Sequence, residues 1–315
     1  MIPVAKSICI ANSVTLAELA SLNDLLLIRG STHESRSEET AVPIFSQATV
    51  WHLRHEQSTE ERMTFDSEAG PLEFSMRSTS SRQSFVDATR GRAVVIDITG
   101  LSHSHWAWLL QAGFASNELR SLSALYVEPE SYTFSESPVG GEFFDLSERI
   151  MGIAPMPGFA TIRPRVGDFV FVALLGFEGP RLTHMIEEVQ PNQVLTYPII
   201  GVPGFQIEFP FFAIQGNRRT LQKEEGIWAN HRFVRANCPN SLYSVLSEIR
   251  AEHPSKVIKI APIGTKPHAL GAVLFKLNNP ASVDLIYDHP VRKPGRTSGA
   301  SSALLYRLDL FRGGF

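Results

Sequence analysis

The sequence predicts an α/β protein with largely parallel sheets. Short runs of β-branched and aliphatic residues bounded by Gly or Pro predict strands. These runs are apolar at consecutive positions, which is typical of parallel strands buried on both faces. Segments with helical spacing alternate with them, which indicates an open, doubly wound sheet. With 315 residues, of which 43% are hydrophobic and 19% charged, the chain can bury a full core.

The individual elements follow from these patterns. Strands are predicted at Asp24–Gly30, Ala93–Gly100, Leu122–Pro129, Phe169–Gly176, Lys256–Gly264 and Ser282–Pro290. Helices are predicted at His105–Gly113, Arg181–Val189, Ser241–His253 and His268–Leu277. The region Trp51–Ser81 alternates polar and apolar residues around Gly70, which predicts a hairpin or an antiparallel edge ribbon.

The two halves of the chain carry the same features in the same order. "AVVIDITGLSHSHWAWLLQAG" and "KVIKIAPIGTKPHALGAVLFK" each combine a buried strand, a Gly turn, a loop with a His and an apolar helix. A strand ending in Tyr-x-x-Pro follows each, with Tyr126 or Tyr287, and Arg36 or Arg181 follows an upstream Gly turn. This order predicts an internal duplication of a Rossmann-like unit. The alternative is that any two parallel β-α units align this well.

The duplication sets the expected domain boundaries. The first Rossmann-like unit covers residues 1–135, with an antiparallel insertion around 45–85. A crossover linker rich in Pro and Gly covers 136–167, and the second unit covers 168–315.

Composition narrows the classes of function. The formal net charge of -3 argues against general nucleic-acid binding. Cys9 and Cys238 form no disulfide framework and no zinc spacing, so we expect a reducing cytoplasm. We expect no signal peptide and no membrane, because no apolar run approaches the roughly 20 residues that span a bilayer.

The loop "GTKPHALG" is the strongest candidate for a ligand site. Ligands of open α/β sheets bind at the carboxyl ends of the strands, where helix N-termini favour anions. Gly264 allows close approach of a ligand, while Thr265, Lys266 and His268 offer hydrogen bonds or charge. A nucleotide-like or phosphorylated ligand is therefore expected. The alternative is the ordinary start of a helix, with Thr as the N-cap and Pro in the first turn.

Two further loops hold candidate ligand-binding residues. These are Arg29, Ser31, Thr32 and Arg36 in "IRGSTHESRS", and Glu178 and Arg181 in "GFEGPR". Arginine binds phosphate in a bidentate manner, which favours an anion pocket. The alternatives are a solvated loop for the first group and a surface position at a helix start for Arg181.

The sequence assigns no catalytic residue, metal or cofactor. The P-loop spacing, the dinucleotide-binding G-x-G-x-x-G and the G-x-S-x-G elbow are missing from it. His103 and His105 are spaced for one face of an extended segment and suit metal binding or acid–base work. No carboxylate cluster with metal spacing accompanies them, so we expect no metal.

The segment Ile200–Arg219 combines Pro and Gly, expected to break any regular element, with Phe205, Phe209, Phe211 and Phe212. Such an apolar segment packs on the core, on a second copy of the chain, on a protein partner or on a nucleobase. The part Phe205–Phe212 is the expected contact for a partner or for self-association.

"IAPIGTKPHALGAVLF" resembles the Rossmann-type nucleotide-sensing domains associated with CRISPR systems, mainly over residues 256–290. The resembling turn is Gly264, Thr265 and Lys266, although Ile263 stands where the family often has a second Gly. The resemblance implies binding of cyclic oligoadenylate in a pocket at a two-fold dimer interface. The family usually adds a nuclease or DNA-binding domain, which is not visible here. Two units in one chain would imitate the dimer.

We therefore expect a soluble ligand-sensing or regulatory protein that recognises a nucleotide-like anion, in a bacterial defence or signalling system. Rossmann-like folds host many chemistries, so two alternatives stay open. One is a hydrolase or glycosidase acting on a nucleotide. The other is a non-catalytic assembly subunit whose aromatic segment docks to a partner.

Overall fold

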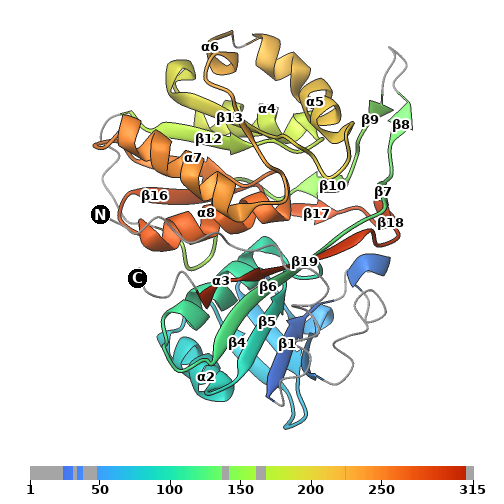
Figure 1. The fold of residues 1–315 in the computed structure, drawn as a ribbon, viewed down its shortest axis with the longest axis vertical. Coiled ribbons are helices and arrows are strands. Elements are labelled where there is room, and N and C mark those ends of the chain that lie inside the picture. Colours follow the sequence, from blue (N-terminus) through green and yellow to red (C-terminus); the bar gives the residue numbers. More distant parts are fainter. Residues whose placement is uncertain are drawn as a thin grey trace. The chain divides into compact units, whose positions relative to one another are not determined.

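The computed structural model describes residues 24–30, 34–37, 48–136, 142–160, 168–223 and 225–309. It has a mixed α/β fold with parallel strand pairs, as the sequence predicts (Figure 1). The chain divides into two compact units. Unit 1 is Met1–Ser131 together with Thr297–Phe315, and unit 2 is Tyr132–Arg296.

Unit 1 is built on a seven-stranded sheet with the strand order β19-β6-β5-β1-β2-β3-β4. Its strands are β1 (Leu25–Arg29), β2 (Thr49–Leu53), β3 (Arg62–Asp66), β4 (Leu72–Ser75), β5 (Ala93–Asp97), β6 (Ser121–Glu128) and β19 (Ser302–Arg307). Its helices are α2 (Thr79–Thr89), α3 (His103–Phe114) and the 3-10 turns η1 (Ser35–Ser37) and η4 (His55–Gln57). Strands β6, β5, β1 and β2 pair in parallel. The pairings of β2 with β3, β3 with β4 and β19 with β6 are antiparallel.

Aromatic side chains fill the space between this sheet and its helices. Trp51, Phe65, Phe74, Phe85 and Trp108 lie with ring centroids 5.8 to 6.4 Å apart. All of them are buried. Rings in stacked, tilted and edge-on contact at these distances give a dense core that anchors α2 and α3.

Unit 2 is built on a six-stranded sheet with the order β11-β16-β15-β12-β13-β14. Its strands are β11 (Ala154–Pro155), β12 (Val170–Leu174), β13 (Thr196–Gly201), β14 (Arg232–Val234), β15 (Ile258–Ala261) and β16 (Val283–Tyr287). Its helices are α4 (Gly179–Val189), α5 (Phe209–Lys223), α6 (Glu225–Trp228), α7 (Pro239–Glu252), α8 (Lys266–Asn278) and the 3-10 turn η5 (Gln193–Leu195). Among the described strands of this sheet, β11 pairs with β16 in an antiparallel manner and the other pairs are parallel.

Short ribbons complete the described residues. They are β10 (Ser147–Ile150) with β17 (Pro290–Arg292), β8 (Ser135–Glu136) with β9 (Glu142–Phe143), and β7 (Ser131–Tyr132) with β18 (Thr297–Ser298).

The predicted buried strands and helices are all present, and the antiparallel ribbon is confirmed. β3 and β4 form that ribbon, and Gly70 adopts φ 110 in the turn between them. Glycine adopts this conformation without steric cost.

The boundaries of the units differ from those expected. Strand β19 pairs with β6, so the residues from Thr297 onward join unit 1 instead of closing unit 2. The expected crossover linker contains β10 and β11, which pair with β17 and β16 of unit 2. Both pairings join segments far apart in sequence, and no local pattern reports such contacts.

The expectation that Ile200–Arg219 lacks regular structure is wrong, because α5 begins at Phe209. Pro210 lies in the first helical turn, where proline removes no intrahelical hydrogen bond. Gly216 lies inside the helix, at a position where a Cβ atom would come within 2.1 Å of Phe177 O. Only glycine fits there. The glycine is therefore a packing residue and does not break the helix.

Candidate functional site

The candidate site lies at the carboxyl ends of the parallel strands of unit 2. From β12 the chain runs outward to β13 and β14, and it returns through α7 to β15 and β16 on the other side of β12, so the strand order reverses between β12 and β15. Open α/β sheets bind ligands at such a switch point. The predicted residues Gly264, Thr265, Lys266, His268, Glu178 and Arg181 follow β12 and β15 and meet at this edge.

Two glycine turns bring the ends of β12 and β15 into contact. A Cβ on Gly264 would lie 2.7 Å from Leu175 O, and one on Gly176 would lie 2.7 Å from Ile263 O. Neither position has room for a side chain, so glycine permits this close backbone approach.

Thr265 and His268 fix the start of α8. Thr265 is the N-cap: its Oγ1 accepts from His268 N at 3.3 Å and donates to Ala236 O at 3.0 Å. His268 is fully buried, and its Nε2 lies 3.0 Å from Arg235 O. Burial lowers the pKa of His268 to about 4, so the imidazole is neutral and its Nε2–H donates to this carbonyl. Both side chains hold α8 against the loop after β14.

Lys266 and Arg235 are the cationic residues beside this cap. Lys266 is the first residue of α8 and is only 6% exposed, whereas Arg235 is exposed on the loop after β14. The N-terminus of a helix carries a partial positive charge, and Lys266 adds a second positive charge to it. A bound anion would offset both charges. The sequence gives no signal that Arg235 lies beside this helix cap, so the sequence analysis does not name it.

Arg181 ties three strand ends together. Its Nε and Nη2 donate to the two carboxylate oxygens of Asp288, both at 2.7 Å, and its Nη1 donates to Ile263 O at 3.2 Å. Burial alone would lower the pKa of Arg181, but the hydrogen bonds and charge of Asp288 outweigh it and raise that pKa above its ordinary value. The guanidinium is thus hydrogen-bonded to other residues of unit 2.

Glu178 has a similar internal role. One carboxylate oxygen accepts from Leu146 N at 2.8 Å and the other from Ser147 Oγ at 3.0 Å. The second oxygen also lies 3.7 Å from Arg181 Nη1. Glu178 therefore anchors β10 beside the turn after β12.

The other predicted ligand residues belong to unit 1. Arg29 donates to Ser37 O at 2.5 Å, and Arg36 pairs with Glu34 at 2.7 Å and donates to Val127 O at 3.0 Å. Both arginines are buried, so neither lies in a solvated loop. Ser31 and Thr32 lie outside the described residues.

His289 follows β16 at the candidate edge, and its φ of 44 has no counterpart in the sequence pattern. Its ring is in edge-on contact with Tyr287, at 5.3 Å between centroids. The sequence contains the residue in "YDHP" but gives no signal of this backbone conformation.

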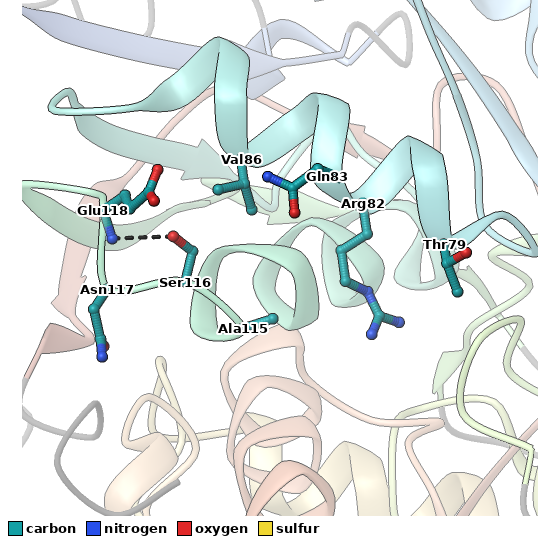
Figure 2. Close-up of a pocket in the computed structure, with 8 residues that line it drawn as sticks. All are labelled: Thr79, Arg82, Gln83, Val86, Ala115, Ser116, Asn117 and Glu118. Carbon is teal, nitrogen blue, oxygen red and sulfur yellow. Dashed lines mark hydrogen bonds between the residues drawn. The ribbon is translucent and has the colours of Figure 1, made fainter.

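Unit 1 also carries a surface pocket of about 410 Å³ between α2 and the loop before β6. Figure 2 shows Thr79 and Arg82 at one end and Asn117 and Glu118 at the other, with Val86 and Ala115 between them. Arg82 donates to Gln111 at 3.1 Å, and Ser116 Oγ accepts from Glu118 N at 3.0 Å. Because its loop precedes β6, this pocket lies at the amino edge of the sheet, opposite the edge that holds the Gly100 turn.

His103 and His105 do not lie in an extended segment, because both are buried in the first turn of α3. His105 Nε2 is 2.8 Å from Thr59 O. Among the residues that the structure describes, no three His, Cys, Asp or Glu side chains are grouped for a metal ion. Within the same residues, every helix is too short or too polar to cross a membrane.

Comparison with known proteins assigns no family to the chain. The chain matches no protein-family model, and a search of curated proteins found no significant match.

Proposed function

We propose that the chain is an internal duplication of a Rossmann-like unit and acts as a ligand-sensing or regulatory protein. In this proposal a nucleotide-like anion binds at the carboxyl edge of the unit 2 sheet. The contact between the Gly176 and Gly264 turns, at the switch point beside the start of α8, carries the proposal.

The strand orders of the units support duplication. β6-β5-β1-β2 in unit 1 corresponds to β16-β15-β12-β13 in unit 2, both in direction and in chain order. An antiparallel strand, β19 or β11, lies outside the last parallel strand of each. The four equivalent parallel strands and the equivalent antiparallel edge are what a duplication would produce.

Matching side chains also support duplication. The Arg36 guanidinium lies 5.7 Å from the ring centroid of Tyr126, and that of Arg181 lies 5.8 Å from the centroid of Tyr287. These pairs occupy equivalent places in the predicted repeat.

The first turns of α3 and α8 match as well. Ser102 and Thr265 are the N-caps, and each accepts from the backbone N–H of a histidine, His105 or His268. Nε2 of each histidine lies within hydrogen-bond distance of a backbone carbonyl of a neighbouring loop. Gly100 also meets Gly30, where a Cβ would lie 1.6 Å from Gly30 O.

The difference between the copies favours unit 2 as the anion site. The first helical residue is His103 in unit 1 and Lys266 in unit 2. Lys266 adds a charge that a phosphate can meet, while Gly264 leaves the backbone without a Cβ beside it.

A thermal-shift measurement tests this site. We expect at least one of ATP, AMP, cyclic AMP and cyclic tetra-adenylate to raise the melting temperature of the wild type. Lys266→Ala is expected to abolish that rise while keeping the fold, because the charge facing the phosphate is lost. Lys223→Ala, an exposed lysine in the last turn of α5, is the matched control and keeps the rise. An unchanged shift in Lys266→Ala contradicts the site.

Mass spectrometry of the incubated nucleotide separates sensing from the enzyme alternative. Recovery of the intact nucleotide supports a sensor. Conversion to a cleaved product supports a nucleotide hydrolase or glycosidase on the same scaffold.

A second candidate function, assembly through self-association, is favoured by the surface around α5. Phe209 and Phe212 pack inward on Phe177 and Phe144, whereas Ile207 is 87% and Phe211 is 67% exposed. Exposed large apolar residues beside an aromatic cluster are typical of an interface.

We expect the wild type to self-associate and Phe211→Asp to shift it toward the monomer, because a charge cannot be buried unpaired in an apolar contact. Light scattering after size exclusion measures the mass. Val194→Asp, at another exposed apolar residue (65% exposed), is the control and leaves the mass unchanged. A wild type that is monomeric at every concentration contradicts this function.

A further inference from the structure

The surface pocket of unit 1 has two walls that the core holds in place. One wall is α2, and the other is the turn Ala115–Glu118 at the end of α3. Phe85 of α2 and Trp108 of α3 are both buried, and their rings are in edge-on contact at 6.1 Å between centroids. The volume of about 410 Å³ suits a small molecule. The pocket is therefore a preformed part of unit 1.

One end of the pocket carries a positive charge. Arg82 is partly buried there, and its Nη2 donates to the neutral amide of Gln111 at 3.1 Å. Within the part of the chain that the structure describes, no carboxylate pairs with Arg82, whereas Arg77 and Arg90 are both in ion pairs. The hydroxyl of Thr79 lines the same end, in the first turn of α2 (Figure 2). A guanidinium without a counter-charge, beside a hydroxyl, favours a carboxylate or another anion.

The other end of the pocket carries a negative charge. Glu118 lines it, and its carboxylate lies 3.0 Å from Nε of Arg90. The same guanidinium also pairs with Asp87 at 2.8 Å, so two carboxylates share one cation and one negative charge remains. The side chain of Glu118 is 46% exposed, which leaves carboxylate oxygens accessible to a ligand. Asn117 lines this end as well and adds an amide oxygen. A positively charged group fits here.

Apolar surface separates the two charged ends. The side chains of Val86 and Ala115 lie between them (Figure 2). Arg90, the partner of Glu118, follows Arg82 by eight positions, which corresponds to roughly 12 Å along a helix. The ammonium and carboxylate of a single amino acid are too close together to reach both ends. An extended tripeptide spans about 10 Å between its termini, which matches the separation.

We propose that this pocket binds a short peptide with free termini. Its carboxylate accepts hydrogen bonds from Arg82, and its ammonium group donates to Glu118 and Asn117. A small apolar side chain packs on Val86 and Ala115. The site goes beyond the proposed function, because it belongs to unit 1 and recognises a zwitterion instead of a nucleotide.

Calorimetry of the full chain with three forms of one probe tests the ligand class. The probe is tri-alanine, used with free termini, with an acetylated N-terminus and with an amidated C-terminus. We expect the free form to bind saturably and each blocked form to bind at least tenfold more weakly, because one ion pair is lost in each. No binding of the free form, or equal binding of all three, overturns the proposal.

Variants assign the two ends of the peptide. Arg82→Gln is expected to weaken binding of the free form at least tenfold without changing that of the amidated form. Glu118→Gln is expected to do the same for the free and acetylated forms. Arg77→Gln, whose side chain is 76% exposed outside the pocket, is the control and keeps the wild-type Kd. Wild-type affinity for the free form in Arg82→Gln or Glu118→Gln contradicts the assignment.

A third variant tests the location without removing a charge. Ala115 is exposed, so Ala115→Trp is expected to fill the pocket and abolish binding while the melting temperature stays that of the wild type. Unchanged binding by Ala115→Trp would place the peptide elsewhere and reject the pocket as its site.

Discussion

At the scale of single residues, an ion pair inside unit 2 engages Arg181, one of the predicted ligand-binding residues. The sequence marks Arg181 as an anion-binding candidate, but its guanidinium is paired with Asp288, with the two side chains 12% and 0% exposed. A sequence pattern cannot distinguish these outcomes, because the partner lies more than a hundred residues away along the chain. Arg181 therefore holds together residues that follow β15 and β16.

Removal of Arg181 should destabilise unit 2 strongly. Arg181→Ala leaves the carboxylate of Asp288 buried without its partner, and we expect the free energy of unfolding to fall by about 3–5 kcal/mol. Urea titration measures this. Arg77→Ala breaks an exposed pair with Glu61, in which the arginine side chain is 76% exposed, and should change stability by less than about 1 kcal/mol. A similarly small effect for Arg181→Ala would show that the ion pair between Arg181 and Asp288 does not stabilise unit 2.

At the scale of elements, α8 is positioned by contacts to the loop after β14. Thr265 and His268 both bond to carbonyls of that loop. The sequence predicts the helix and its N-cap correctly, because these are local signals. It does not predict that His268 is buried and hydrogen-bonded to a backbone carbonyl, because that carbonyl belongs to a loop distant in sequence.

The buried His268 should make stability depend on pH. Its pKa is about 4 in the folded protein, so the unfolded chain binds a proton at a higher pH than the folded chain does. Stability is therefore fully present above about pH 6.5 and falls as the pH is lowered toward 4, by about 3 kcal/mol in total.

Denaturation at pH 7.5 and pH 5.0 checks this expectation. The wild type should lose about 2 kcal/mol more than His268→Gln over this interval, because glutamine keeps an N–H donor but does not titrate. Equal losses in both proteins would show that His268 does not carry the pH dependence.

Elements differ in how well the sequence predicts them. Buried parallel strands such as Ala93–Asp97 and Val170–Leu174 are visible as continuous apolar runs. Strand Thr196–Gly201 and helix Phe209–Lys223 are not, because Pro and Gly inside them resemble breakers. Pro198 lies within a paired strand and Gly216 at a tight contact between helices, so both are compatible with regular structure.

At the scale of the whole molecule, the chain leaves unit 1, forms unit 2 and returns to add β19 to unit 1. The sequence predicts the number of units because each repeats the same local signals. It does not predict the return of the C-terminal strand, since the partner of Ser302 is Glu128. Several candidate residues predicted from the sequence follow β12 and β15 at the carboxyl edge of the unit 2 sheet, whereas the sequence gives no signal that Arg235 lies beside them.

Nucleotide binding to the full chain tests the central claim most directly. Calorimetry of the wild type with ATP, AMP, cyclic AMP and cyclic tetra-adenylate, each followed by mass spectrometry of the ligand, gives both affinity and fate. We expect saturable binding of at least one nucleotide, recovery of that nucleotide intact, and loss of binding in Lys266→Ala. Absence of binding by every nucleotide, or equal binding by Lys266→Ala, would contradict the account.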